Sequence, residues 1–229
     1  MIMTVRKNAN KMKANEKKRF KDIVKKLIDN GTYGKFVSFH ADMSHMMHGS
    51  MGMVGRQRFL PWHRMYLLKL EQEMQSVDPL SFIPYWDWTT SKKIPVMLKN
   101  FMPTVNVPGR GNITVSRNVG TPTHLPTKSD IKSVLSEDTY TLFTTQLEFS
   151  HNNVHGWVGG IMFDIQYSPT DPVFWLHHAQ IDRIWSMWQN NPQNTGKNPS
   201  LSGNDRTMDP WIETESQTRS ITALGYSYS

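Results

Sequence analysis

The chain has 229 residues and no cysteine, which excludes disulfide bonds and thiolate metal ligands. Its length suits one hydrophobic core, and no repeat or linker divides it, so we expect a single domain over residues 1–229. The formal net charge is +7, but residues 1–29 hold ten Lys or Arg against three Asp or Glu, and the rest of the chain sums to zero. The basicity therefore belongs to one segment.

This basic segment is expected to consist of a flexible N-terminus, residues 1–14, and an amphipathic helix over 15–29. Apolar side chains in the second part follow helical spacing, so its lysines form the solvated face. The segment has no aromatic interleaving and no nucleic-acid motif, and we expect no nucleic-acid partner. No run is apolar enough to span a membrane, and no secretory signal is recognisable, which makes the cytoplasm the default location. Nothing in the sequence indicates the oligomeric state.

The next helices are predicted at about 32–44 and 62–76. His63 shares a face of the second helix with Leu67 and Leu70, so it points where the apolar stripe points. A single buried histidine is usually a hydrogen-bonded core residue. Several histidines on inward faces favour a metal site.

An irregular segment then precedes three further helices. Residues 89–128 are rich in Pro, Gly, Thr and Asn, and such a stretch in an enzyme commonly borders the active-site mouth. The helices are expected at about 130–136, 140–157 and 173–189. The chain is therefore predicted to be mainly α, with a four-helix-bundle core and long irregular loops.

These last helices carry the densest group of candidate ligands. His151 and His155 lie four residues apart and therefore on the same helix face. Glu148 lies on that face too, where its carboxylate would either pair with an arginine or act on a water beside a metal. His177 and His178 follow on the last helix, and periodicity does not decide which of them is a ligand. Imidazoles without thiolates suit copper or zinc, and copper binds them more tightly.

Several runs resemble signatures of the tyrosinase family, which are dinuclear (type 3) copper proteins. They are HNNVH from His151, DPVFWLHHAQID from Asp171, FLPWHR from Phe59, PYWDW from Pro84 and MDPW from Met208. The resemblance spans about residues 30–229 and is to prokaryotic-type members with neither a caddie protein nor a C-terminal plug domain. It implies two copper ions in the four-helix core, each held by three histidines.

For one copper ion the resemblance implies the ligands His151, His155 and His178, since the family uses the second histidine of the His177–His178 pair. Asp182 lies one turn after His178 and is expected to accept a hydrogen bond from it.

For the other ion the resemblance implies His40 and His63. The family usually places its second histidine nine residues before the one in Pro-Trp-His, and this sequence has Val54 there. We choose His48, which lies nearer the helix of His63, with His45 as the alternative. The glycine after His48 is expected to let the backbone turn toward the metal.

The resemblance implies a copper-dependent tyrosinase that hydroxylates monophenols at the ortho position and oxidises o-diphenols to o-quinones. Its partners are small phenols, and dioxygen is the co-substrate. Glu148 is then the glutamate that holds a water, and Asn152 helps this water to accept the phenolic proton; without the resemblance, Asn152 is an ordinary polar residue. The alternatives are a catechol or o-aminophenol oxidase without monophenolase activity, and a haemocyanin-like oxygen carrier.

Overall fold

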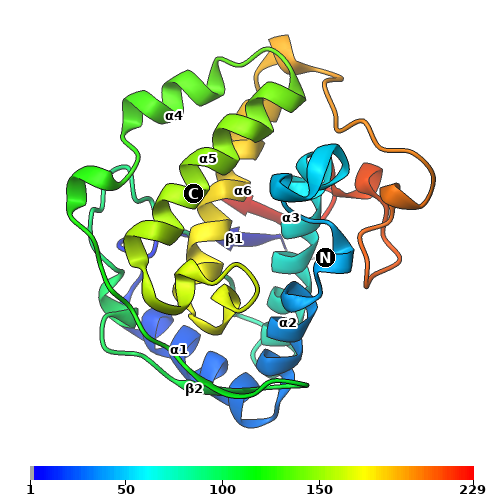
Figure 1. Cartoon of the computed structure of the whole chain (residues 1–229). Helices are drawn as coiled ribbons and strands as arrows, with labels where there is room; N and C mark the ends of the chain where they lie inside the picture. Colours follow the sequence, from blue (N-terminus) through cyan, green and yellow to red (C-terminus); the bar gives the residue numbers. More distant parts are fainter. Residues whose placement is uncertain (1–2) are drawn as a thin grey trace.

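The computed structural model describes residues 3–229, which form six α-helices and four short strands (Figure 1). The helices are α1 (Ala14–Asp29), α2 (Thr32–Ala41), α3 (Gly52–Val77), α4 (Lys128–Leu135), α5 (Tyr140–Val158) and α6 (Val173–Gln189). The strands are β1 (Thr4–Arg6), β2 (Thr104–Val107), β3 (Gly111–Thr114) and β4 (Tyr226–Tyr228). In this part of the chain no helix is long and apolar enough to cross a membrane.

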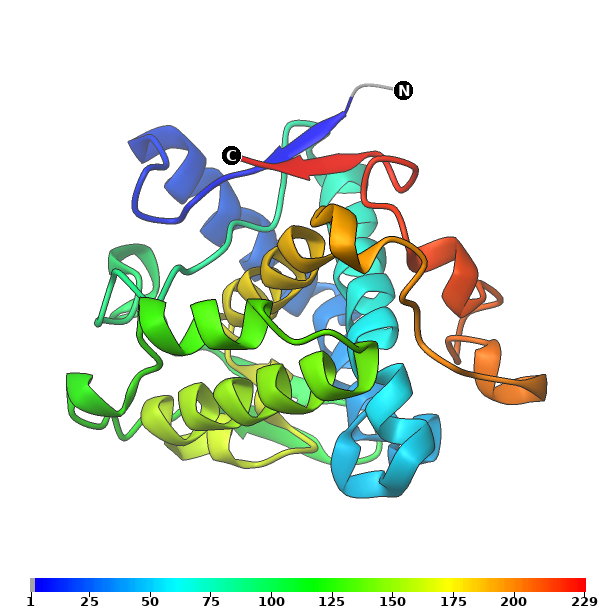
Figure 2. The same ribbon diagram turned by 90° about the horizontal axis from the view of Figure 1, so that it is seen from above.

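The core is built from α2, α3, α5 and α6, which confirms the mainly α prediction. Figures 1 and 2 show α6 in the middle of the molecule, with α3 and α5 on either side of it, and long loops around them. Helix α1 packs on α2 and α3 and buries its apolar stripe, Phe20, Ile23, Val24 and Leu27, while its lysines face outward.

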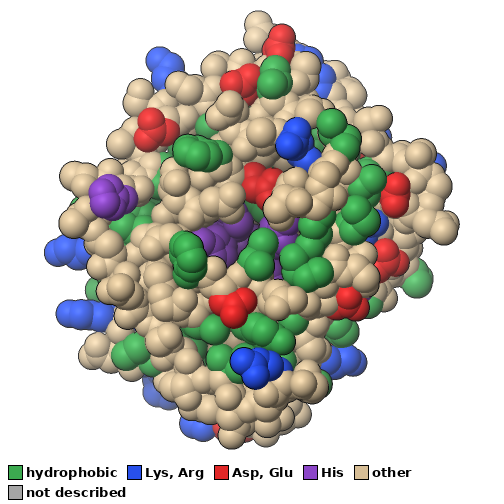
Figure 3. Space-filling view, viewed as in Figure 1, with side chains coloured by type: hydrophobic (Ala, Val, Ile, Leu, Met, Phe, Trp, Pro, Cys, Tyr) green, Lys and Arg blue, Asp and Glu red, His purple; other side chains and the backbone are tan. Residues whose placement is uncertain are grey.

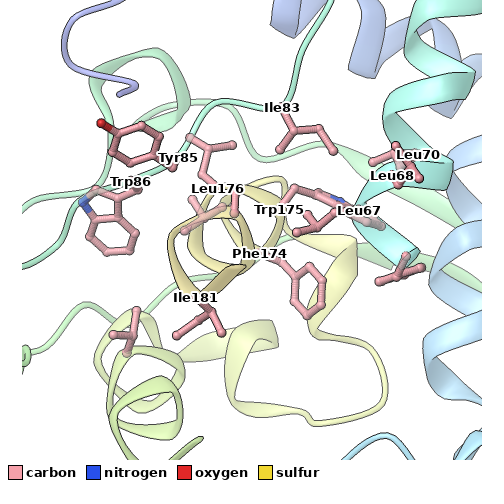
Figure 4. Close-up of a cluster of buried hydrophobic side chains, with 14 of the residues drawn as sticks. Leu67, Leu68, Leu70, Ile83, Tyr85, Trp86, Phe174, Trp175, Leu176 and Ile181 are labelled. Carbon is pink, nitrogen blue, oxygen red and sulfur yellow. The ribbon is translucent and has the colours of Figure 1, made fainter. Parts of the chain in front are cut away.

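The first turns of α6 are buried on all sides, so they bring large apolar side chains into the centre of the core. Phe174, Trp175 and Leu176 have no exposed surface, and Figure 4 shows them between Leu67 of α3 and the extended segment that carries Trp86. This packing excludes water around the helices that carry the histidines.

Helix α3 begins ten residues before the predicted start at residue 62. Pro61, which was expected to precede the helix, lies inside it. Proline has no N–H, so the carbonyl of Gln57 loses its helical partner. The hydroxyl of Tyr140 on α5 donates to that carbonyl over 3.1 Å. A tertiary contact thus makes the proline tolerable within the helix.

The N-terminal segment is ordered, so the prediction of a flexible 1–14 is wrong for the residues that follow Met3. Strand β1 pairs in parallel with β4, with Thr4 opposite Tyr226. Arg6 is fully buried and donates to the carboxylates of Glu71 and Asp182. Residues 1 and 2 of the predicted segment lie outside the described residues. The many charged residues of this segment had suggested that it is solvated and flexible. Instead, the buried ion pairs of Arg6 with Glu71 and Asp182 hold it in place.

Candidate metal centre

Three histidines from separate elements converge at one side of the core. His40 lies in the last turn of α2, His48 in the loop before α3, and His63 on α3; all three are buried. Nε2 of His40 lies 3.3 Å from Nε2 of His48 and 3.4 Å from Nε2 of His63. The three ring nitrogens therefore face a common point.

Backbone carbonyls fix the tautomers of this first cluster. Nδ1 of His63 donates to the carbonyl of Phe59 over 2.7 Å, and Nδ1 of His40 donates to the carbonyl of Gln166 over 3.3 Å. A carbonyl can only accept, so each Nδ1 carries the proton and each Nε2 presents a lone pair. Lone pairs that face each other at 3.4 Å repel unless a cation lies between them.

A second cluster is formed by His151 and His155 of α5 with His178 of α6. Nε2 of His178 lies 3.1 Å from Nε2 of His151 and 3.4 Å from Nε2 of His155. Nδ1 of His155 donates to the carbonyl of Met162 over 2.7 Å, which again leaves the Nε2 lone pair facing inward.

The two clusters belong to one site. The rings of His63 and His178 are stacked, with centroids 4.4 Å apart and planes at 19°. Each ring belongs to a different cluster, so α3 and α6 place two three-histidine groups side by side.

A fourth imidazole, that of His177, also lies within reach of the second cluster. The indole N–H of Trp88 donates to Nδ1 of His177 over 3.1 Å. An indole only donates, so Nδ1 uses its lone pair here and Nε2 of a neutral ring carries the proton. This geometry leaves His178 as the better ligand of the pair.

Asp182 does not contact His178, and the expected hydrogen bond between them is wrong. Its carboxylate accepts from Arg64 over 2.5 Å and from Arg6 and the hydroxyl of Tyr226. Nδ1 of His178 has no hydrogen-bond partner among the described residues. Two buried arginines compete more strongly for the carboxylate than a neutral imidazole can.

Burial disfavours the charged form of five of the six triad imidazoles, and a metal ligand must be neutral. Burial, with smaller contributions from neighbouring histidines, holds the pKa of His63, His151 and His178 well below its usual value. Burial followed by the neighbouring His48 does the same to the pKa of His40. Burial lowers the pKa of His155 to about 4, partly opposed by its hydrogen bond to Met162.

The loop before α3 brings His48 into the first cluster and leaves His45 outside it. Helix α2 ends at Ala41 instead of continuing to residue 44, and His45 packs its ring on Trp62 with centroids 5.9 Å apart. The other histidine that the sequence offers, His124, is exposed on a distant loop.

Glu148 lies behind His48, and sequence reasoning missed what holds it there. The backbone N–H of Gly49 donates to its Oε1 over 2.8 Å, and Nδ1 of His48 lies 3.7 Å from the same oxygen. The side chain is 11% exposed and has no arginine partner among the described residues. Gly49 has no positive φ; its role here is to leave space, because a Cβ there would stand 2.5 Å from Oε2 of Glu148 and the carboxylate would have to move.

Asn152 connects the second cluster to an opening at the surface. Its Oδ1 accepts from Nδ1–H of His151 over 3.0 Å. A cavity of about 270 Å³ lies over these atoms, lined by His48, His151, Asn152, His155, Gly156, Met162, Phe163, Ile165 and Ser168. Figure 3 shows histidine side chains at the bottom of this hollow, bordered by apolar and acidic side chains.

The donor set fits a pair of copper ions. Six imidazoles, five of them buried, face inward in two groups of three, and no thiolate is present in the chain. Such nitrogen donors suit copper, and two adjoining triads suit two ions.

Comparison with known proteins gives a consistent result. The common central domain of tyrosinase matches residues 30–121 and 106–191. A tyrosinase of Streptomyces galbus is 37% identical over 91% of this chain and 93% of its own, and that of Streptomyces glaucescens is 35% identical over 93% and 94%. Among solved structures, the haemocyanin of Rapana thomasiana has a TM-score of 0.77 at 20% identity, covering all of this chain and 70% of that one. A polyphenol oxidase of Thermothelomyces thermophila has a TM-score of 0.74 at 20% identity, covering 99% and 89%.

Proposed function

This chain belongs to the tyrosinase family, and we propose that it hydroxylates monophenols at the ortho position and oxidises o-diphenols to o-quinones. A monophenol and one O2 then give an o-quinone and one water. Two o-diphenols and one O2 give two o-quinones and two waters. Small phenols and dioxygen are the substrates.

Six histidines would hold the two copper ions of a dinuclear centre, the cofactor of this family. The first ion takes His40, His48 and His63, and the second takes His151, His155 and His178. When bound, the copper pair supplies the binding and reduction of dioxygen. The protein contributes rigid ligands, since each triad draws on two or more elements of the packed core.

The observation that carries monophenolase activity is the position of the Glu148 carboxylate. One oxygen, Oε1, is held by the backbone N–H of Gly49, while Oε2 has no protein donor among the described residues. Glu148 is not among the residues that line the cavity, so its free oxygen would accept the phenolic proton through a water, which leaves a phenolate and a carboxylic acid. Glu148 is therefore the proposed proton acceptor.

Asn152, which lines the cavity, would assist this transfer. Its side-chain oxygen is used by His151, so its amide N–H2 remains to donate to a water or to the phenolic oxygen. It would also keep the ring of His151 in the tautomer that presents Nε2.

Oxygen uptake by the copper-loaded protein tests the proposal, with tyramine as the monophenol, catechol as the diphenol and metal-free protein as the blank. Uptake with both substrates is the expected result. Uptake with catechol alone would refute the roles of Glu148 and Asn152 and leave a catechol oxidase. Reversible oxygen binding without turnover would indicate a carrier.

A further inference from the structure

One wall of the cavity over the two triads is apolar. Its floor is formed by imidazoles and Asn152, and one side is formed by Met162, Phe163 and Ile165 from the segment after α5. Phe163 is 77% exposed and Ile165 is 43% exposed, so both stand at the rim where the para substituent of a docked phenol would emerge. The rim is therefore apolar.

No residue that lines this cavity is a lysine, arginine, aspartate or glutamate. The chain does carry an excess of positive charge, but it lies in residues 1–29, outside the cavity lining. A carboxylate on a substrate would thus lose water at the rim without gaining a cationic partner, which is unfavourable.

Two carboxylates lie close to the lining. Asp164 lies between Phe163 and Ile165, is exposed, and is held by the backbone N–H groups of Gln166 and Tyr167 over 3.0 and 3.3 Å. Among the described residues no lysine or arginine pairs with it. Glu148 adds a second carboxylate behind His48. Both would repel an anionic substituent.

We propose that this mouth selects phenols that carry no carboxylate, a specificity set by the apolar rim and by Asp164. The inference rests on the proposed function, because it concerns the substrate of the same site. When bound, the metal pair would attract a carboxylate from the floor of the cavity, whereas Asp164 lies between two rim residues and is therefore closer to the para substituent.

Gly156 provides the position at which this selectivity can be reversed. It follows His155 on α5 and lines the cavity, and a Cβ built on it meets no atom within 4 Å. A longer side chain at this position can therefore extend toward the rim. Gly156→Arg would supply the missing cation, and Gly156→Gln is its matched neutral control.

The test compares 3-(4-hydroxyphenyl)propanoate with its amide, which has nearly the same shape and no charge. We expect kcat/KM for the acid to be lower by about tenfold or more at pH 7, which corresponds to one unpaired charge near a carboxylate. Asp164→Asn should bring the ratio of kcat/KM for the amide to kcat/KM for the acid closer to one. Asp138→Asn should leave the ratio unchanged, because Asp138 is exposed just before the start of α5, about 25 Å from His155 by the helical rise per residue. Gly156→Arg should narrow or reverse the ratio, and Gly156→Gln should not.

Anaerobic equilibrium dialysis of the same two compounds gives a second readout that does not need turnover. Equal kcat/KM for acid and amide, with turnover of both, would overturn the inference while the proposed function stands. Tighter binding of the amide without oxidation of any phenol would support the inference and refute the proposed function. An unchanged ratio in both Asp164→Asn and Gly156→Arg would also overturn it.

Discussion

The backbone N–H of Gly49 donates to Oε1 of Glu148 over 2.8 Å, and any Cβ at position 49 would stand 2.5 Å from Oε2 of the same carboxylate. The loop that supplies His48 therefore also positions the proposed proton acceptor. Because residue 49 has no side chain, the loop that carries His48 can pack directly against the Glu148 carboxylate.

Gly49→Ala should displace the Glu148 carboxylate, because the new methyl group cannot share its space. We expect kcat for a monophenol to fall by about tenfold or more, with a much smaller loss for catechol, since general-base assistance contributes on this scale or above. Oxygen uptake with both substrates measures it, and Glu148→Gln should change the ratio in the same direction. Equal losses with both substrates would contradict the proposed role.

His48→Ala should remove one of two copper ions, whereas His45→Ala should retain both. Only the Nε2 of His48 faces those of His40 and His63, and His45 packs on Trp62. Copper per chain, measured after dialysis, distinguishes the two variants. Two ions in His48→Ala and one in His45→Ala would reverse the assignment.

The His177–His178 pair gives a parallel test on α6. We expect His178→Gln to lose one copper ion and His177→Gln to keep two. His177→Gln should instead lower the free energy of unfolding by about 1–3 kcal/mol, if the buried indole N–H of Trp88 is left without its partner. Copper content and urea unfolding of both variants check this, and loss of copper in His177→Gln would refute it.

Acid should destabilise the metal-free protein in a defined pH range. Burial keeps the pKa of His40, His63, His151 and His178 well below the ordinary value near 6.5, and that of His155 at about 4. Between these values the unfolded chain binds protons that the folded chain does not, so the free energy of unfolding decreases as pH falls from about 6.5 toward 4. Urea unfolding at pH 7.5, 6 and 5 measures the decrease.

His155→Gln is the matched variant for this pH dependence. It removes one of the groups that titrate differently in the folded and unfolded protein. The number of protons taken up on unfolding should therefore fall by up to one, and the slope of the free energy of unfolding against pH should become shallower. A slope unchanged in the variant would show that His155 is already protonated in the folded protein.

Arg6→Leu should destabilise the protein by about 3–5 kcal/mol, because Glu71 is left as a buried carboxylate without its arginine and Asp182 loses one of two. Arg19→Leu is the control: its ion pair with Asp78 is partly exposed and should contribute about 1 kcal/mol or less. Urea unfolding compares the two. Equal effects would mean that the buried network does not hold the N-terminal strand.

Local periodicity was enough to determine much of this protein. The spacing of His151 and His155 places both on one face of α5 in any helix, and the apolar stripe of α3 directs His63 inward, because these are properties of 3.6 residues per turn. The helical class and the histidine-rich core follow from patterns of this kind.

Other features depend on the tertiary structure. The end of α2 and the path of a loop place His48, and not His45, beside His40 and His63, and a hydrogen bond from Trp88, 89 residues away in sequence, distinguishes His177 from His178, the ligand that the resemblance had implied. Pro61 stays within α3 because a tyrosine from α5 satisfies the freed carbonyl. Each of these features depends on a contact with a residue distant in the chain. The local spacing of residues does not determine which distant residue makes that contact.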